Sequence, residues 1–234
     1  MPLRALAAVP LIALATLVLG TLAMLARLID GRGEASRALG RTWARLVLAV
    51  LGVRVDVRGA EHVPERAAVY AANHGSALDI PILLACLPAD FRLIHKRSLS
   101  FVPVLGWSLR FAGHIAIDRR RPFSARRSLE TAVRRLREGV SLAVFPEGTR
   151  SPDAQVLPFK RGSFVLAIEA GVAVLPISID GVKRVVPRGI FSLKPGAVRI
   201  TIHPPIETTA LAAGGAAALA EQVRRIVASG CQED

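Results

Sequence analysis

The chain has 234 residues, with 31 Lys and Arg against 18 Asp and Glu, a formal net charge of +13 and two cysteines. This length suits one α/β domain with a short additional segment, and it can bury a core without disulfide bonds. Cys86 and Cys231 lie far apart and lack metal-ligand spacing, which excludes a cysteine-based zinc site or iron–sulfur cluster. Hydrophobic residues make up 52% of the chain and the mean hydropathy is +0.42, so the composition excludes a disordered protein and indicates a membrane connection.

The basic residues are almost all arginines, because the lysines are only Lys96, Lys160, Lys183 and Lys194. Genomic composition bias is one source of this excess, but the surface should still attract anionic partners such as nucleic acid, anionic lipid or phosphorylated substrates. Aromatic residues make up only 5%, which argues against a stacking platform for single-stranded nucleic acid. We therefore expect anionic membrane lipids and phosphorylated substrates as partners, and no nucleic acid.

The N-terminal part of the chain contains an uncharged run from Ala5 to Ala26. A helix of that length measures about 33 Å, enough to cross the roughly 30 Å hydrocarbon layer of a membrane. A signal peptide is the alternative, since Arg4 precedes the run. The run is longer than a usual signal-peptide core and no clean cleavage site follows it, which favours a retained membrane helix.

Five arginines follow this run, at positions 27, 32, 37, 41 and 45. The positive-inside rule then predicts location at the inner membrane, with the rest of the chain on the cytoplasmic side. A second apolar stretch, Leu46 to Val53, is too short to span alone. It either pairs with the first helix as a re-entrant hairpin or forms a buried helix of the main domain. The predicted division is a membrane-anchoring segment at residues 1–50 and one domain at residues 51–234.

Apolar strands alternate with helices along the rest of the chain. The expected strands are Val53–Arg58, Ala67–Ala72, Phe91–Ile94, Ile115–Ile117, Leu142–Phe145, Val172–Ile179 and Val198–Ile202. The expected helices are Leu78–Leu87, one capped by Ser124 that carries Leu129, Val133 and Leu136 on one side, Gly162–Ala170 and Ala216–Val227. This alternation predicts an α/β fold with a mainly parallel central sheet and helices on both faces.

A histidine and a carboxylate flank the turn after the second expected strand. His74 stands at the strand's carboxyl end, where ligands bind in open α/β sheets, and Asp79 follows five residues later. The Gly75-Ser76 turn allows the two side chains to meet. An aspartate that accepts from one ring nitrogen fixes the tautomer and leaves the other nitrogen free to take a proton. The alternative is that Ser76 and Asp79 form a capping box and His74 is an ordinary turn residue.

Two further clusters of polar residues follow strands. The segment Phe145 to Ser151 reads FPEGTRS, in which Gly148 permits a turn and Arg150 presents a donor fork suited to phosphate. Lys160 precedes an expected helix N-terminus, which is itself an anion site. Lys96 and Arg97 follow another strand, ahead of a segment containing Pro103, Gly106 and Trp107. Solvated surface loops are the alternative for these clusters, and the run Arg119–Arg121 is typical of plain surface.

In their order and residue identities, these blocks resemble the motifs of the lysophosphatidic acid acyltransferase family, the 1-acylglycerol-3-phosphate O-acyltransferases. The family's NHxxxxD block stands here as Asn73 to Asp79, and its FPEGTRS block is intact at Phe145 to Ser151. Its basic pair before a Pro…Gly-Trp segment matches Lys96-Arg97 through Trp107, and its apolar strand with a central proline matches Val174 to Ile179. The resemblance covers roughly residues 50 to 205.

This resemblance implies transfer of a fatty acyl group from acyl-CoA or acyl carrier protein to the sn-2 hydroxyl of 1-acyl-glycerol-3-phosphate, giving phosphatidic acid. His74 would be the general base and Asp79 would orient it. The chain has no G-x-S-x-G motif and no convincing nucleophile, so we expect direct attack without an acyl-enzyme, a metal or another cofactor. The family's pattern implies substrate binding by Glu147, Gly148, Thr149 and Arg150, with Lys96, Arg97 and Lys160 as further phosphate contacts.

Three other functions compete with this interpretation. A sister acyltransferase would act on another lyso-lipid, such as lyso-ornithine lipid. A basic membrane-binding or nucleic-acid-binding protein would explain the charge of +13 but leaves the His74–Asp79 spacing and the intact FPEGTRS unexplained. A hydrolase would use the same histidine to activate water.

Overall fold

The computed structural model describes residues 3–31, 33–118, 122–153, 155–187, 192 and 194–231. Seven strands of this part of the chain form one sheet in the order β1-β7-β6-β2-β5-β3-β4. They are β1 (Val53–Arg58), β2 (Ala68–Ala72), β3 (Phe91–Lys96), β4 (Ile115–Ile117), β5 (Ser141–Val144), β6 (Ala173–Asp180) and β7 (Gly196–Ile202). Neighbouring strands pair in parallel except β6 and β7, which are antiparallel. The predicted α/β fold with a mainly parallel sheet is confirmed.

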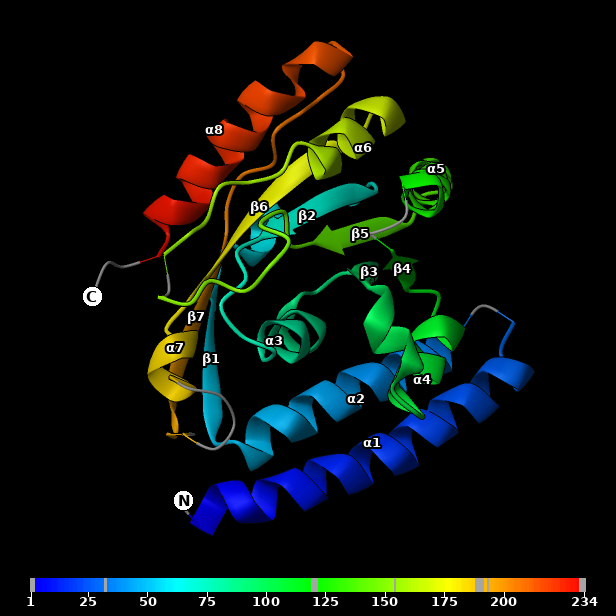
Figure 1. Ribbon diagram of the computed structural model, residues 1–234, viewed down its shortest axis with the longest axis vertical. Coiled ribbons are helices and arrows are strands. Elements are labelled where there is room, and N and C mark those ends of the chain that lie inside the picture. The colour runs from blue at the N-terminus through cyan, green and yellow to red at the C-terminus, as the bar shows by residue number, and fades with distance from the viewer. Residues whose placement is uncertain are drawn as a thin grey trace.

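Helices cover both faces of the sheet (Figure 1). They are α1 (Leu3–Ile29), α2 (Glu34–Val50), α3 (Asp79–Cys86), α4 (Leu105–Phe111), α5 (Pro122–Arg137), α6 (Gly162–Ala170), α7 (Val182–Val185) and α8 (Ala216–Ser229), with short 3-10 turns η1 (Ala60–His62), η2 (Arg97–Phe101) and η4 (Ala213–Gly215). Alternation along β2 divides the core: Tyr70 packs in the cluster under α2 and α3, whereas Val69 and Ala71 pack in the cluster under α5, α6 and α8. The buried strand β2 therefore lies at the centre of the molecule.

The predicted elements match the observed ones to within a few residues, with one correction. The helix expected to be capped by Ser124 begins at Pro122, so Ser124 lies within its first turn and is not the cap. Proline is favoured at the first position of a helix, because its missing N–H needs no partner there. The run Arg119–Arg121 lies outside the described residues.

The first two helices form an antiparallel hairpin against the main domain (Figure 1). Trp43 Nε1–H of α2 donates to Thr16 Oγ1 of α1 at 2.9 Å, and α2 packs on α3 with Val47 and Leu48 buried. The apolar stretch from Leu46 therefore completes a helix that is buried against the domain and also paired with α1. The stretch is thus part of a buried helix, and a re-entrant placement of the helix pair in a membrane stays a prediction.

Helix α1 keeps one apolar face uncovered. Its segment Ala7–Ile29 is long and apolar enough to cross a membrane by length and composition. The exposed side chains are Val9, Leu11, Leu14, Leu17, Val18, Leu22, Leu25, Leu28 and Ile29. An uncovered apolar face of this extent marks an interaction surface.

Two arginines that follow the apolar run tie α2 to the loop between α3 and β3. Arg37 Nε lies 2.9 Å from Asp90 Oδ2. The Arg41 guanidinium donates to the carbonyl oxygens of Leu87 and Ala89. Arg32, counted in the same cluster, lies outside the described residues. The charges of Arg37 and Arg41 thus have a structural use in addition to any effect on membrane orientation.

Candidate active site

The predicted site residues follow strands that are neighbours in the sheet. β2 and β5 pair in parallel, so their carboxyl ends lie at the same edge. The turn that carries His74 follows β2, and the loop from Phe145 to Ser151 follows β5. Sheet order therefore brings together two segments that are about 70 residues apart in the sequence.

The imidazole of His74 contacts the carboxylate of Asp79. His74 Nδ1 lies 2.7 Å from Asp79 Oδ2, and the same oxygen accepts the backbone N–H groups of Gly75 at 2.8 Å and Ser76 at 2.9 Å. Asp79 is fully buried at the first residue of α3. Because Nδ1 carries the proton that the carboxylate accepts, Nε2 is left with a lone pair that can take another proton.

The capping alternative is wrong in its main point, because α3 begins at Asp79 after Leu78 and no side chain caps its N-terminus. Only half of a capping box is present: the Ser76 N–H donates to Asp79, but the Ser76 hydroxyl accepts the N–H of Leu78 at 3.3 Å, and the N–H of Asp79 donates to the backbone carbonyl of Ser76. Asp79 makes the bond from the Ser76 N–H and the bond to His74 with one carboxylate oxygen. The turn that starts α3 is therefore also the support that orients the imidazole.

The His74 ring also stacks on Phe145. The ring centroids are 4.2 Å apart and the planes differ by 18°. The His74 side chain keeps 16% of its surface exposed, so it is enclosed yet reachable. Contact with Asp79 at one edge and with Phe145 on one face fixes the plane of the imidazole.

The backbone of His74 is tied to the FPEGTRS loop at both of its polar groups. Its N–H donates to Glu147 Oε1 at 2.8 Å, and its carbonyl accepts the N–H of Ser151 at 2.8 Å. The loop is closed in turn by a bond from the Lys160 N–H to the carbonyl of Pro146 at 3.0 Å. These bonds make the His74 turn and the loop one unit.

Glu147 is buried in this unit, with 3% of its surface exposed. Burial raises its pKa to about 7, against the lowering effect of the N–H bonds from His74 and Leu157. The negative charge of Asp79 adds to the rise. Among the described residues Glu147 Oε2 has no hydrogen-bond partner. The geometry thus gives Glu147 a contact with the His74 backbone, and its predicted contact with substrate stays a prediction.

Asn73 is a site residue whose role sequence reasoning missed. Its side-chain Nδ2–H donates to the carbonyl of Ile179 at 2.9 Å, and its Oδ1 accepts the N–H of Ile179 at 2.7 Å. This pair of buried bonds holds the end of β2 against β6 immediately before His74. The only signal in the sequence was the asparagine that opens the NHxxxxD block.

The predicted phosphate contacts lie at two places around this turn. Thr149, Arg150 and Lys160 are exposed on or near the FPEGTRS loop, and Gly148 has a φ of 76°, a left-handed conformation that favours glycine. Lys96 is exposed at the end of β3. Arg97 begins η2, and its Nη1 lies 3.7 Å from Asp118 Oδ2. β3 is two positions from β2 in the sheet. The roles of these residues in binding stay predictions.

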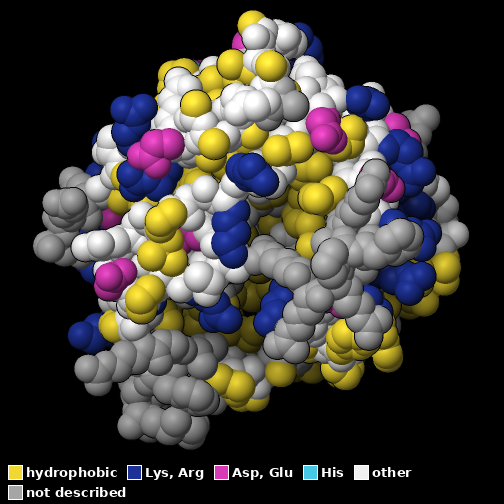
Figure 2. Space-filling view, turned by 45° about the horizontal axis from the view of Figure 1, so that its top comes forward, with side chains coloured by type: hydrophobic (Ala, Val, Ile, Leu, Met, Phe, Trp, Pro, Cys, Tyr) yellow, Lys and Arg dark blue, Asp and Glu magenta, His cyan; other side chains and the backbone are white. Residues whose placement is uncertain are grey.

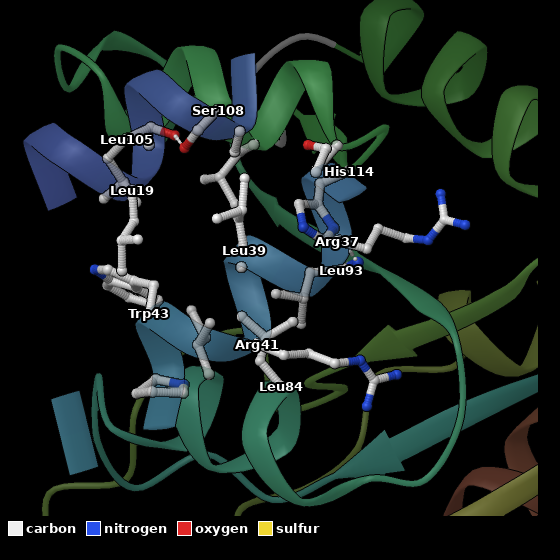
Figure 3. Close-up of a pocket in the computed structure, with 18 of the residues that line it drawn as sticks. Leu19, Arg37, Leu39, Arg41, Trp43, Leu84, Leu93, Leu105, Ser108 and His114 are labelled. Atoms are coloured by element: carbon white, nitrogen blue, oxygen red, sulfur yellow. Dashed lines mark hydrogen bonds between the residues drawn. The ribbon is translucent and has the colours of Figure 1, made fainter. Parts of the chain in front are cut away.

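Two hollows border the His74 turn. An apolar cavity of about 260 Å³ lies between α1, α2, α3, α4 and β3, with Leu19, Leu39, Trp43, Leu84 and Leu93 on its wall (Figure 3). It reaches the turn at Ala77 and Ile80. A polar groove of about 610 Å³ borders Asn73, Gly75 and Asp79. Lys and Arg side chains gather around a hollow on the face shown in Figure 2.

A serine of β6 contacts a histidine outside the His74 turn. Ser178 Oγ is 2.7 Å from His203 Nε2, but the hydroxyl also donates to the carbonyl of Val227 at 2.7 Å. Ser178 is fully buried. Because its proton is already bonded to a backbone carbonyl, Ser178 is not an activated nucleophile. The contact holds the end of α8 to β6.

Cys231 lines the polar groove, which also borders Asn73, Gly75 and Asp79. Burial raises its pKa to about 12, and the negative charges of Asp180, Glu147 and Asp79 add to the rise. The thiolate is the nucleophilic form of cysteine, so this side chain is inert at neutral pH. It offers no route to an acyl-enzyme.

A comparison with family models identifies the chain's relationship. Residues 54–180 match the model described as Acyltransferase, from the second residue of β1 to the end of β6. The chain belongs to the Acyltransferase family. The match contains the His74 turn, the FPEGTRS loop and the Asn73–Ile179 contact.

Named relatives and a solved structure agree with this. The chain is 36% identical over 171 residues to the chloroplast 1-acyl-sn-glycerol-3-phosphate acyltransferase of Arabidopsis thaliana, covering 72% of this chain and 48% of that protein. It is 34% identical to the human 1-acyl-sn-glycerol-3-phosphate acyltransferase alpha, covering 89% and 74%. It resembles the crystal structure of the 1-acyl-sn-glycerophosphate acyltransferase PlsC from Thermotoga maritima, with a TM-score of 0.78, 29% identity and coverage of 97% and 96%. The chain spans about half the length of the plant relatives.

Proposed function

We propose that this protein transfers a fatty acyl group from a thioester to the sn-2 hydroxyl of 1-acyl-glycerol-3-phosphate, producing phosphatidic acid for phospholipid synthesis. The observation that carries the proposal is the 2.7 Å contact of His74 Nδ1 with Asp79, in a chain of the Acyltransferase family. The relatives' names, 1-acyl-sn-glycerol-3-phosphate acyltransferase, support the choice of acceptor.

The chemistry follows from the lone pair on His74 Nε2. This nitrogen takes the proton of the acceptor hydroxyl as the oxygen attacks the thioester carbonyl, and Asp79 stabilises the imidazolium that forms. The tetrahedral intermediate then expels the thiolate. His74 returns the proton to the sulfur, so the products are the ester and a free thiol. No covalent enzyme intermediate and no metal or other cofactor takes part in this scheme; acyl-CoA or acyl carrier protein is a substrate.

The apolar cavity and the cations of the loops suit different parts of the substrates. The apolar cavity accepts an alkyl chain without exposing it to water, and its border at Ile80 is one residue from Asp79. The cations of the two loops, namely Arg150, Lys160, Lys96 and Arg97, are available to the phosphate of the acceptor or to the anionic donor. A guanidinium such as that of Arg150 can hold two phosphate oxygens at once.

The protein works, in this proposal, at the inner membrane with its catalytic part on the cytoplasmic side. The uncovered apolar face of α1 supplies the attachment, and the charge of +13 favours anionic lipids at the same surface. A lyso-lipid acceptor resides in that membrane, so attachment places the enzyme next to its substrate.

The test is an acyltransferase assay on the purified full-length protein with a panel of lyso-lipid acceptors and both thioester carriers. Phosphatidic acid formed from 1-acyl-glycerol-3-phosphate, at a rate well above that with other lyso-lipids, supports the proposal. Faster acylation of lyso-ornithine lipid would reassign the acceptor. Release of free thiol without any acceptor, at the same rate as with one, would mean a hydrolase.

A further inference from the structure

The polar groove beside the His74 turn is lined by three cations that the family resemblance did not single out. Lys183 and Arg184 come from α7, and Arg224 comes from α8. The groove has a volume of about 610 Å³, within the range of sites for small molecules. Neither this groove nor the apolar cavity is lined by Lys96, Arg97, Arg150 or Lys160.

Two of the three cations already have counter-charges. Arg184 Nη2 lies 3.0 Å from Asp180 Oδ2. Arg224 makes a two-pronged pair with Glu221, at 2.9 and 2.7 Å. Both guanidinium groups are therefore balanced by carboxylates of the protein.

Lys183 is different, because no carboxylate of the described chain lies within 4.0 Å of its ammonium nitrogen. The side chain is half-buried. The three carboxylates that share the groove have other partners: Asp180 pairs with Arg184, Asp153 accepts from the Ser151 hydroxyl, and Asp79 accepts from His74. An ammonium group that is partly shielded from water and has no counter-charge contributes more binding free energy to an anionic ligand than an exposed or already paired cation does.

The position of Lys183 relates this charge to the reaction. Gly75, the residue after His74, has its open side toward Lys183: a Cβ at Gly75 would lie 4.0 Å from Lys183 Cε. The groove also borders Asn73, on the other side of His74 in the sequence. The end of the Lys183 side chain, at Cε, therefore lies near the turn that carries the proposed general base.

We propose that Lys183 binds the phosphate of the acceptor and holds the acceptor's head group in the groove beside Gly75. The inference rests on the proposed function and deepens it, because it assigns the phosphate a contact from α7. The ammonium donates up to three hydrogen bonds to phosphate oxygens as a point charge.

The length of each substrate decides between acceptor and donor. In 1-acyl-glycerol-3-phosphate the phosphate is attached to the carbon next to the one that carries the reacting hydroxyl. When that hydroxyl is at His74, the phosphate must lie close to the same turn. The donor's nearest phosphate is separated from its thioester by the whole pantetheine arm. It cannot lie against Gly75 while the thioester is at His74.

The first measurement compares steady-state kinetics of wild type, Lys183→Met, Lys183→Arg and the matched control Lys194→Met. Lys194 is an exposed lysine that lines neither hollow. Methionine keeps the aliphatic length and removes the charge. Lys183→Met should raise the KM for 1-acyl-glycerol-3-phosphate at least about tenfold and leave the KM for acyl-CoA unchanged, since bonds to charged groups contribute strongly to binding. Lys183→Arg should recover most of the loss, and Lys194→Met should match wild type.

An acceptor without phosphate makes the test specific. With 1-acylglycerol as acceptor, wild type and Lys183→Met should have the same kcat/KM, because this acceptor has no phosphate for Lys183 to bind. Equal losses with both acceptors would mean that Lys183 has only a structural role. A rise in the acyl-CoA KM alone would place the residue in the donor site. Either result overturns the inference.

A second measurement needs no turnover and uses glycerol 3-phosphate as the probe. It should raise the Tm of wild type and Lys194→Met but not of Lys183→Met, because a ligand stabilises only the protein that binds it. If wild type is active and Lys183→Met changes neither the kinetics nor the Tm response, the inference about Lys183 is refuted and the proposed function stands. If wild type is inactive but glycerol 3-phosphate stabilises it only when Lys183 is present, the proposed function is refuted and the phosphate-binding role of Lys183 stands.

Discussion

Glu147 holds the backbone of His74: its Oε1 accepts the His74 N–H at 2.8 Å from a position with 3% exposure. The carboxyl group follows β5, and the histidine follows β2. This one bond joins two of the four sequence blocks, so the geometry of the base depends on a residue that the family pattern assigns to substrate. Its ionisation should therefore be visible in the stability of the protein.

Stability should fall as the pH rises through the range from about 4.5 to about 7. Burial raises the pKa of Glu147 from 4.5 to about 7, so in this range the folded protein holds a proton that the unfolded chain has lost. The group's contribution is therefore complete at the lower end and is lost toward the upper end. A shift of this size corresponds to about 3 kcal/mol.

The check is the free energy of unfolding at several pH values for wild type and Glu147→Gln. The glutamine keeps the acceptor for the His74 N–H and cannot titrate, so the variant should lose less stability than wild type between about pH 5 and pH 8. Glu169→Gln, at an exposed glutamate of α6, should leave the slope as in wild type. Identical slopes for wild type and Glu147→Gln would contradict the assignment.

Asn73→Ala should destabilise the protein by about 2–4 kcal/mol, because it leaves the buried N–H of Ile179 without a partner and leaves the Ile179 carbonyl with only the weak thiol donor of Cys231. Asn73→Asp keeps one acceptor and loses the donor, and it sets a carboxylate against the Ile179 carbonyl, so it should not restore wild-type stability. Chemical unfolding in detergent measures both variants. A change below about 0.5 kcal/mol for Asn73→Ala would mean that β2 and β6 hold together without this contact.

Local patterning was sufficient to locate the strands but not the contacts between them. The alternation in Val53–Arg58 and the apolar run ending at Ala72 predicted β1 and β2 closely, because one or both faces of each strand are buried. The bonds of His74 to Glu147 and Ser151 depend on β5 lying beside β2, which is a property of strand order. Strand order is set by packing over the whole chain, so it cannot be read from the residues of either motif.

The same reasoning explains what was missed around the site. Lys183 reaches the His74 turn because β6, which precedes it, is the other neighbour of β2. Helix α2 was not predicted as a whole, because its first half is rich in arginine and reads as a polar surface. Two of those arginines, Arg37 and Arg41, bind the loop between α3 and β3 and so permit burial of the helix.

High-salt washing should not release the protein from membranes. Attachment through the exposed leucines of α1 is apolar burial, which salt does not screen, and each buried leucine contributes about 1.5–3 kcal/mol. Replacing Leu14, Leu17 and Leu22 together by glutamate should move the protein toward the soluble fraction. Sedimentation before and after the wash measures both effects. Quantitative release of wild type by salt would indicate electrostatic adsorption through the basic surface.

The most direct test of the account is the rate of phosphatidic acid formation by purified wild type and His74→Ala, measured with acyl-CoA and 1-acyl-glycerol-3-phosphate. Removal of a general base lowers kcat by about 10²–10⁴-fold. The account predicts a loss in this range, with the Tm and the membrane attachment of the variant unchanged from wild type. Near-normal turnover by folded His74→Ala would contradict the assignment of His74 as the base and, with it, the mechanism proposed for this protein.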